Sequence, residues 1–347
     1  MAEARRLSSR SASEQKPPDD GAVPRQSGAR GAAAPKHHPV SRLVAFMNQK
    51  GGVGKSTSVV NIGAAIAAEG RSTLIVDLDP QGHASLHLGI DPAGAELNLY
   101  ELLLASPEDL STGAVDPNRA VIPSRTNLDV LASTVDLAAA EAELADLPAR
   151  ERRLSDALRV IRSRYEFILI DCPPSLGLLT LNGLAAAREV IVPMQAHFLA
   201  LQGLGRLLET VQMIGAGVNP KLRVSGVILC MHDESSKHAR EVVADMEKFF
   251  EESRARACAW SGARVYRPAV RRNIKLAECP SFGQTIFEYA PSCPGAMDYR
   301  AIAGEMVAEW DRMLARREVA AGMPAVQPVP TVTVRPASAS AVRGAVD

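Results

Sequence analysis

The sequence predicts an α/β protein built on a doubly wound, mainly parallel sheet with helices on both faces. Short apolar runs rich in β-branched residues alternate with helical stretches along the middle of the chain, as buried parallel strands do. Polar or glycine-rich motifs follow three of these runs, at the strand ends where sheets of this class bind ligands. The runs are residues 43–47, 73–76, 128–131, 167–170, 190–192 and 224–229.

The first run is followed by a glycine-rich turn and then by a helical pattern over residues 59–66. Glycines let the backbone wrap around an anion without a Cβ in the way, and the N–H groups at the start of a helix bind phosphate. This setting predicts a P-loop NTPase fold with a nucleotide-phosphate site. The predicted cofactor-binding residues are Lys50, Gly51, Gly52, Val53, Gly54, Lys55, Ser56 and Thr57.

Three side chains of this turn stand out. Lys55 is expected to supply positive charge to the outer phosphates, and the Ser56 hydroxyl is placed to bind Mg²⁺. The usual P-loop pattern has a glycine five residues before Gly54, but that position is Gln49. A second lysine, Lys50, stands directly before the glycine pair instead. This departure is the most informative feature of the sequence.

Carboxylates close two further runs. Asp77 and Asp79 follow the second run, and Asp171 follows the fourth. Two carboxylates spaced i, i+2 at a strand end could serve a metal ion and a water molecule separately; in the alternative interpretation, Asp79 only begins a turn with Pro80. An aspartate that ends an apolar strand is the Walker B arrangement, in which the carboxylate helps to hold Mg²⁺ beside a P-loop.

The predicted ATP-binding domain spans residues 41–318, with helical stretches that include residues 149–164 and 204–214. Residues 1–40 are rich in Ser, Ala, Arg, Pro and Gly and lack periodicity. They are predicted to be a disordered basic tail, because they cannot bury enough apolar surface to offset the entropy of ordering. Residues 319–347, rich in Pro, Val and Ala, are predicted to be a second disordered tail.

The composition of the chain indicates which class of protein it represents. The 347 residues carry no net formal charge and are 46% hydrophobic, which is typical of a soluble globular protein. Five scattered cysteines without a C-x-x-C pair, together with a nucleotide loop, predict a reducing cytoplasm. No apolar run approaches the roughly 18–20 residues that span a bilayer. The N-terminus also lacks the apolar segment of a secretory signal.

One segment of this neutral chain, residues 254–275, is strongly basic. It contains seven cations and no acid. Such a run is usually a solvated face, but its isolation within a neutral protein favours a patch that binds the phosphates of DNA. The cations are Arg254, Arg256, Arg264, Arg267, Arg271, Arg272 and Lys275.

The motifs at residues 50–56, 77–82 and 171–175 resemble the deviant Walker A, A′ and B motifs of the ParA/MinD ATPases. Segments 178–196 and 272–283 are similar to the Soj-like ParA branch, and the likeness covers roughly residues 42–315. The resemblance implies an enzyme that hydrolyses ATP to ADP and phosphate with Mg²⁺ and forms a homodimer when it binds ATP. It also implies a cytoplasmic, nucleoid-associated protein that binds DNA non-specifically, does not bind membranes, and positions a chromosome, plasmid or protein cargo with a ParB-like partner.

The resemblance assigns a role to each matched residue. Lys50 is expected to reach the nucleotide of a partner subunit, Lys55 to hold the β- and γ-phosphates of its own, and Asp79 to position the attacking water. A cation donated in trans can accelerate phosphoryl transfer by about 10³–10⁵. The residues expected near the metal are Ser56, Asp77 and Asp171, and those expected to bind DNA are Arg267, Arg271, Arg272 and Lys275.

Some residues depart from the family pattern. Pro is usual where Arg271 stands and Asn where His83 stands, and residues 251–264 hold an insertion, so the assignment of single cations in that region stays open. His83 and His87, spaced i, i+4, could form half of a metal site, but they lack a third ligand and are expected to be ordinary polar residues. Cys172 is expected to be a small buried thiol.

Two other functions stay open. A MinD-like positioning ATPase would bind a membrane through a basic amphipathic helix at its C-terminus, which the prolines after Val326 disfavour. A metabolic P-loop enzyme, such as a small-molecule ligase or a tyrosine kinase, is the third class. The segment 272–283 disfavours the ligase, and the small number of tyrosines, five, disfavours the kinase.

Overall fold

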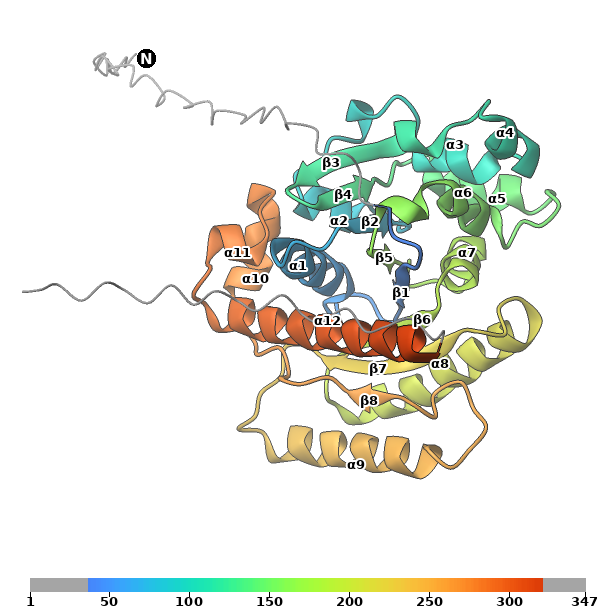
Figure 1. Cartoon of the computed structure of the whole chain (residues 1–347). Coiled ribbons are helices and arrows are strands. Elements are labelled where there is room, and N and C mark those ends of the chain that lie inside the picture. Colours follow the sequence, from blue (N-terminus) through green and yellow to red (C-terminus); the bar gives the residue numbers. More distant parts are fainter. Residues whose placement is uncertain (1–36, 321–347) are drawn as a thin grey trace, which may run out of the picture. The chain divides into compact units, whose positions relative to one another are not determined.

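Eight strands form a single sheet within residues 37–320, the part of the chain that the computed structural model describes (Figure 1). The strand order is β3-β4-β2-β5-β1-β6-β7-β8, and neighbours are parallel except for the pair β3 and β4. The predicted fold class is confirmed. The strands are β1 (Arg42–Phe46), β2 (Thr73–Asp77), β3 (Val121–Arg125), β4 (Leu128–Leu131), β5 (Phe167–Asp171), β6 (Glu189–Met194), β7 (Arg223–Leu229) and β8 (Arg264–Val265).

The six predicted strands are all present, with ends that differ from the expected ones by two residues at most. The sequence did not predict β3 or β8. The residues of β3 are mostly half-buried and pair antiparallel with β4 at the edge of the sheet, so they form no continuous apolar run. β8 contains only two residues, too few to show a periodic pattern.

The register of the sheet brings the three predicted motifs to one edge. Phe46, the last residue of β1, is paired with Asp171 at the end of β5. Asp77, the last residue of β2, is paired with the same aspartate from the other side. The glycine-rich turn after β1 therefore lies beside both carboxylate motifs, at the carboxyl ends of the strands.

Alternate residues of the strands bury into two cores, one on each face of the sheet. In β1, Val44 and Phe46 pack against α1 and α12, whereas Ala45 faces the core beneath α6, α7 and α8. The helices are α1 (Lys55–Ala68), α2 (His83–His87), α3 (Leu99–Leu104), α4 (Pro107–Thr112), α5 (Leu137–Leu144), α6 (Arg153–Ile161), α7 (Leu178–Ala186), α8 (Phe198–Gly217), α9 (Lys237–Ser253), α10 (Lys275–Glu278), α11 (Ile286–Tyr289) and α12 (Pro294–Ala320). Four short 3₁₀ turns are η1 (Pro92–Gly94), η2 (Pro117–Ala120), η3 (Arg162–Arg164) and η4 (Cys279–Phe282).

The three predicted helical stretches are helical over most of their length: residues 59–66 lie inside α1, and the second stretch becomes helical at Arg153. Residues 149–164 contain α6 followed by η3, and residues 204–214 lie inside the longer α8. The insertion at residues 251–264 packs on the edge of the sheet: the backbone N–H of Val224 in β7 donates to the carbonyl of Ala259 (2.8 Å). Within the same insertion, the indole N–H of Trp260 donates to Ser253 Oγ (3.2 Å).

The predicted tails fall mainly outside the described residues, which begin at His37 and end at Ala320. Residues 37–40 belong to the expected N-terminal tail, but His38 already contacts the domain. Its backbone N–H donates to the carbonyl of Ser163 (2.7 Å), and its Nε2 lies 2.9 Å from Ser72 Oγ. At the other end, α12 continues two residues past the expected boundary at 318.

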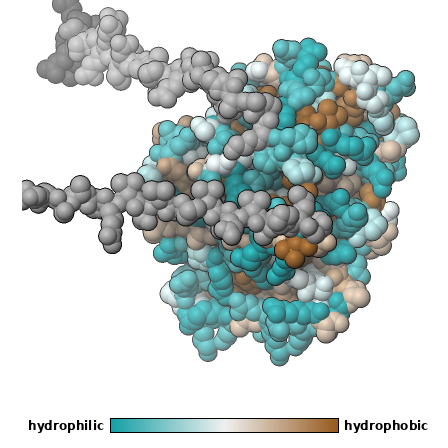
Figure 2. All heavy atoms as spheres, in the orientation of Figure 1, coloured by the Kyte–Doolittle hydropathy of each residue, from teal (hydrophilic) through white to brown (hydrophobic). Residues whose placement is uncertain are grey.

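One face of the described part of the chain is mainly polar (Figure 2). Hydrophilic side chains cover most of the face seen in Figure 2, with hydrophobic residues in small groups. Within residues 37–320, no helix is both long enough and apolar enough to cross a membrane.

Candidate functional site

The glycine-rich turn after β1 is fixed by side-chain hydrogen bonds at its start and by backbone geometry at its end. Asn48 Nδ2 donates to the carbonyl of Pro193 at the end of β6 (2.7 Å), and Asn48 Oδ1 accepts from the backbone N–H of Lys50 (2.9 Å). Gly54 is the N-cap of α1 with φ 91°, a left-handed conformation that favours glycine. The turn therefore delivers Lys55 to the site as the first residue of α1.

Lys55 lies among the carboxylates of β2 and β5. Its Nζ donates to Asp171 Oδ1 at 2.6 Å and is 3.6 Å from Asp79 Oδ2. All three side chains are buried, and the nearby Ser56 hydroxyl favours the charged form of Asp171. The structure thus brings together Lys55, Ser56, Asp79 and Asp171, as the sequence predicts.

Asp77 is held differently from the other two aspartates. Its Oδ2 accepts hydrogen bonds from both the backbone N–H and the hydroxyl of Ser85 in α2 (2.8 Å each), and its Oδ1 accepts from the backbone N–H of Asp79 (3.3 Å). Both oxygens are therefore engaged by the protein. Asp77 fastens α2 and the turn at Asp79 to the end of β2.

Burial and the neighbouring charges set the protonation of this cluster. Burial and the nearby Asp171 raise the pKa of the Asp77 carboxyl to about 7. Burial also raises the pKa of Asp171, although Lys55 opposes that rise. For Lys55, burial disfavours the charged form, but the adjacent Asp171 outweighs it and raises the pKa of the ammonium group. Lys55 thus supplies the positive charge that offsets the repulsion between the carboxylates of this buried site.

Lys50 contacts a different part of the chain. It is exposed, and its Nζ lies 3.0 Å from Nε2 of His197, the residue before α8. The other ring nitrogen, Nδ1, accepts from the backbone N–H of Ala200 and so caps α8. Partial burial and the Lys50 charge lower the pKa of His197. The exposed lysine thus lies beside His197 at the rim of the site.

The site fits a nucleoside triphosphate with Mg²⁺. Asp171 Oδ2 is buried and has no hydrogen-bond partner among the described residues, as expected of an oxygen that a cation would engage. The space beside the Cα atoms of Gly51 and Gly52 is open, so the backbone can approach a phosphate. No group of three or more His, Cys, Asp or Glu residues within 37–320 could hold a metal. Mg²⁺ takes one or two carboxylates and completes its shell with phosphates and waters.

Comparisons with known proteins show to which family the chain belongs. A family model described as an AAA domain matches residues 41–224. The chromosome-partitioning ATPase Soj of Treponema pallidum is 41% identical over 269 residues, which are 78% of this chain and 98% of the relative. The sporulation initiation inhibitor protein Soj of Bacillus subtilis is 39% identical over 78% of this chain and 99% of its own length. The chain belongs to the Soj/ParA family of partition ATPases.

Solved structures agree with this Soj/ParA fold. A protein from Mycobacterium smegmatis described as cobyrinic acid a,c-diamide synthase, with a bound ATP analogue and magnesium, is 35% identical with a TM-score of 0.64. The match covers 78% of this chain and 96% of that structure. The septum site-determining protein MinD of Pyrococcus horikoshii, solved with Mg-ADP, has a TM-score of 0.57 at 23% identity, over 77% of this chain and 96% of MinD. At that identity, the likeness to MinD concerns the fold alone.

The cations that were expected to bind DNA in this ParA-family chain are largely ion-paired within the chain. Arg271 pairs with Asp298 (2.7 Å), Lys275 with Glu278 (2.8 Å), and Arg267 with Glu247. Arg272, the fourth, is exposed, and no carboxylate of the described residues pairs with it. The basic segment thus contains less unpaired charge than its sequence suggests.

Sequence reasoning missed three residues that hold the ParA-type site in place. Ser85 fixes Asp77, Ser133 donates to the Asp79 carbonyl (2.7 Å), and His197 lies beside Lys50. Ser133 and His197 are 54 and 147 residues from their partners, so only the fold brings them together. Ser85 is closer, eight residues after Asp77 in the next helix, but serine is too common to mark such a contact.

Proposed function

We propose that this chain dimerises when it binds ATP, binds DNA non-specifically, and segregates or positions a cargo with a ParB-like partner that stimulates hydrolysis. The observation that carries the proposal is the position of Lys50. The side chain is exposed at the rim of the phosphate site, whereas Lys55 is buried within it. A lysine that lies outside the phosphate site of its own subunit is available to the phosphate site of a second subunit. The expected location is the nucleoid in the cytoplasm.

ATP and Mg²⁺ are the cofactors of this ATPase, and its side chains have separate tasks in hydrolysis. Mg²⁺ neutralises charge on the phosphates and orients them. Lys55 holds the β- and γ-phosphates, and Ser56 and Asp171 hold the ion, with Asp77 as the support of the neighbouring turn. Asp79 lies at the edge of the cluster, where its carboxylate can orient a water molecule. Phosphoryl transfer needs mainly the positioning of the reactants and the stabilisation of charge, and these residues provide both kinds of interaction.

The supply of Lys50 by a partner subunit would make hydrolysis conditional on dimerisation. We therefore expect Lys50→Ala to bind ATP with unchanged affinity but to stay monomeric and lose most of its ATPase activity. Light scattering with ATP and a phosphate-release assay measure these two properties. The matched control is Lys248→Ala, which removes an exposed lysine from α9. Full ATPase activity in Lys50→Ala would refute the proposed role.

DNA binding is supported by the basic segment at residues 254–275 and by the exposed Arg272 within it. Co-sedimentation of the protein with DNA or with liposomes, each with and without ATP, separates a ParA-like function from a MinD-like one. We expect ATP-dependent retention on DNA that weakens steeply with salt, because phosphate contacts release counterions. Retention on liposomes alone would favour the membrane function.

The mycobacterial likeness makes a ligase the second candidate. A ligase couples ATP cleavage to the modification of an acceptor, whereas a partition ATPase hydrolyses ATP without one. We expect ATP turnover in the absence of any small-molecule acceptor, and stimulation by DNA together with a ParB-like protein. Turnover that requires an acceptor carboxylic acid would favour the ligase instead.

A further inference from the structure

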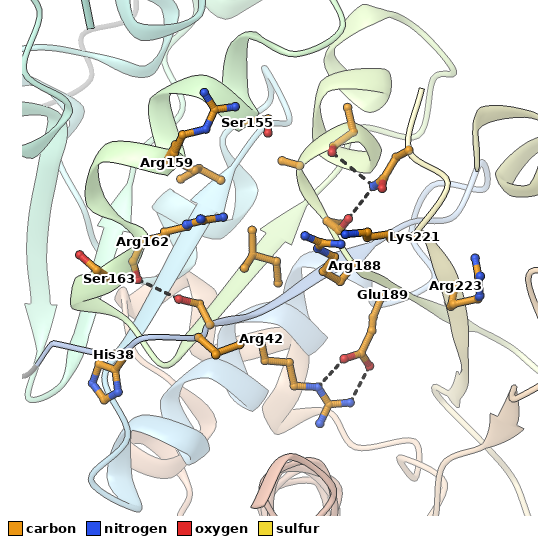
Figure 3. A pocket seen from close by; sticks show the side chains of 18 of the residues that line it. His38, Arg42, Ser155, Arg159, Arg162, Ser163, Arg188, Glu189, Lys221 and Arg223 are labelled. Atoms are coloured by element: carbon orange, nitrogen blue, oxygen red, sulfur yellow. Dashed lines mark hydrogen bonds and ion pairs between the residues drawn. The ribbon is translucent and has the colours of Figure 1, made fainter. Parts of the chain in front are cut away.

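A wide basic pocket lies at the amino-terminal edge of the sheet, opposite to the nucleotide site (Figure 3). Its volume is about 1210 Å³. The first residues of three adjacent strands, Arg42 of β1, Glu189 of β6 and Arg223 of β7, line it together with parts of α6, η3 and α12. The proposed catalytic residues do not take part in it, so its chemistry is independent of the phosphate site.

Positive side chains greatly outnumber negative ones in this basic pocket. Among its described lining residues, eight are Arg or Lys and one, Glu189, is an acid. Glu189 is already paired with Arg42 at 2.6 Å, and Arg159 is paired with Asp156. No carboxylate of the described residues pairs with the other six cations, which are Arg152, Arg162, Arg188, Lys221, Arg223 and Arg317.

These six cations are exposed and come from several elements around the pocket. In Figure 3, the side chains of Arg162 and Arg188 approach the middle of the pocket from opposite sides. Cations held close together without counterions repel each other, and an anionic ligand would remove that cost. In contrast, the segment at residues 254–275 has already paired most of its cations with carboxylates.

The two ends of the described chain meet this same edge of the sheet. His37 lines the basic pocket, and Arg317 lies three residues before the end of α12 at Ala320. By sequence, residues 1–36 contain seven Arg or Lys against four acids, and residues 321–347 contain two against one. Both flanking segments are thus net positive, so neither has the charge to neutralise the pocket.

We propose that the basic pocket binds the phosphodiester backbone of duplex DNA, at a site separate from Arg272. The inference rests on the proposed function, since it assigns a second surface to the same polyanion. The pocket is larger than the ~300–1,000 Å³ of most small-molecule sites. Its cations are spread over several segments and do not converge on a single point, which suits successive phosphates of a long polyanion better than one small anion.

Salt dependence of DNA binding tests the inference. The double variant Arg188→Gln/Lys221→Gln removes two pocket cations, and Arg206→Gln/Lys248→Gln removes one Arg and one Lys from exposed positions on α8 and α9 outside the pocket. Binding of the full chain with ATP to a fluorescently labelled duplex is measured over a salt series. Each lost phosphate contact should reduce the slope of log K against log salt by about 0.9, so two should reduce it by about 1.8.

We expect the weakened slope in the pocket variant alone, with its ATPase activity and melting temperature unchanged. A second variant, Arg162→Gln/Arg317→Gln, removes cations from the other segments of the pocket and should give the same change. A wild-type slope in both pocket variants would overturn the inference while leaving the proposed function intact. Absence of DNA binding by the wild-type protein with ATP would refute the proposed function and this inference with it.

Discussion

At the scale of single residues, Lys50 and Lys55 differ in what the sequence could reveal about them. The glycine-rich motif and the aspartate that closes the fourth apolar run were enough to predict that Lys55 and Asp171 would serve one nucleotide site, because both motifs follow strands of the same sheet. The contact between Lys50 and His197 was not predictable, since no motif marks the histidine, which lies 147 residues away. Predictions succeed here where a motif marks both residues.

The role of Asp79 gives a prediction at this scale. Its carboxylate is 3.6 Å from Lys55 Nζ and is not needed to hold that lysine, which has a shorter contact with Asp171. We expect Asp79→Ala to bind ATP and dimerise but to hydrolyse it at least tenfold more slowly, which corresponds to about 1.4 kcal/mol in the barrier. Single-turnover hydrolysis measures the effect. An unchanged rate would contradict the role.

His87 was expected to be an ordinary polar residue, and the structure corrects this. The side chain is buried, with Nε2 3.4 Å from the Sγ of Cys279 in η4. Burial and the charge of Arg125 lower the pKa of His87 to about 4. Its spacing from the exposed His83 places the two histidines on one side of a helix, but sequence alone does not tell which of them the neighbouring 3₁₀ turn covers.

The low pKa of His87 predicts a pH dependence of stability. An unfolded histidine takes up a proton near pH 6.5, whereas His87 in the folded protein does so only near pH 4. Between these limits the unfolded state binds more protons at this histidine, so the His87 contribution to the free energy of unfolding should fall by up to about 1.4 kcal/mol per pH unit as the pH decreases. The raised pKa of Asp77 acts in the opposite direction over the same range. Above this window His87 contributes no pH dependence.

Urea unfolding at a series of pH values checks this prediction against two variants. His87→Gln should remove the His87 contribution, so that its free energy of unfolding decreases less than that of the wild type as the pH falls from 6.5 to 4. His83→Gln, which changes the exposed histidine of the same helix, should keep the wild-type dependence. Equal pH dependence in His87→Gln and in the wild type would contradict the assignment.

At the scale of elements, the pairing of β7 with β8 explains why the last strand escaped prediction. Gly226 in β7 has φ 155°, and a Cβ built there would lie 2.0 Å from the carbonyl oxygen of Arg264. The two strands pair through Gly226 and Val227 only. A strand that depends on one close backbone approach, and not on an apolar run, leaves little trace in hydrophobic periodicity.

Gly226→Ala should therefore destabilise the protein. The added methyl group must push β8 away from β7, and overpacking of this kind costs about 1–3 kcal/mol. The matched control is Gly205→Ala in α8, where the space for a Cβ is open and a better helix former should stabilise by up to about 1 kcal/mol. Chemical denaturation measures both. Equal stability of the two variants would show that β8 moves without cost.

At the scale of the whole molecule, the strand order decides which predicted motifs meet. The sequence supported a parallel sheet and ligand binding at the carboxyl ends of its strands, and β2, β5 and β1 are indeed neighbours. Ion pairs between side chains that lie far apart in the sequence were harder to predict. The basic segment looked unpaired in sequence, yet Arg264 pairs with Glu305 and Glu309, and Arg271 with Asp298, on a helix that follows later in the chain.

Nucleotide binding should stabilise the whole folded chain, because the site draws residues from three neighbouring strands. A ligand that binds only the folded state at about 100 times its Kd adds about 2.7 kcal/mol. We expect ATP with Mg²⁺ to raise the melting temperature of the wild type and of Lys248→Ala, and to have no such effect on Lys55→Ala. Thermal unfolding with and without ATP measures the shift. A wild-type shift in Lys55→Ala would contradict the phosphate role of Lys55.

The basic pocket and the nucleotide site lie at opposite edges of one sheet, with β1 between Arg42 and the phosphate turn. If two subunits join through their nucleotide edges, their pockets face away from each other at the two poles of the dimer. Such a dimer would be a bivalent cross-linker able to tether two DNA segments, and the second engagement would gain from a high effective concentration. Hydrolysis would then do more than release a subunit: it would also separate the two DNA segments.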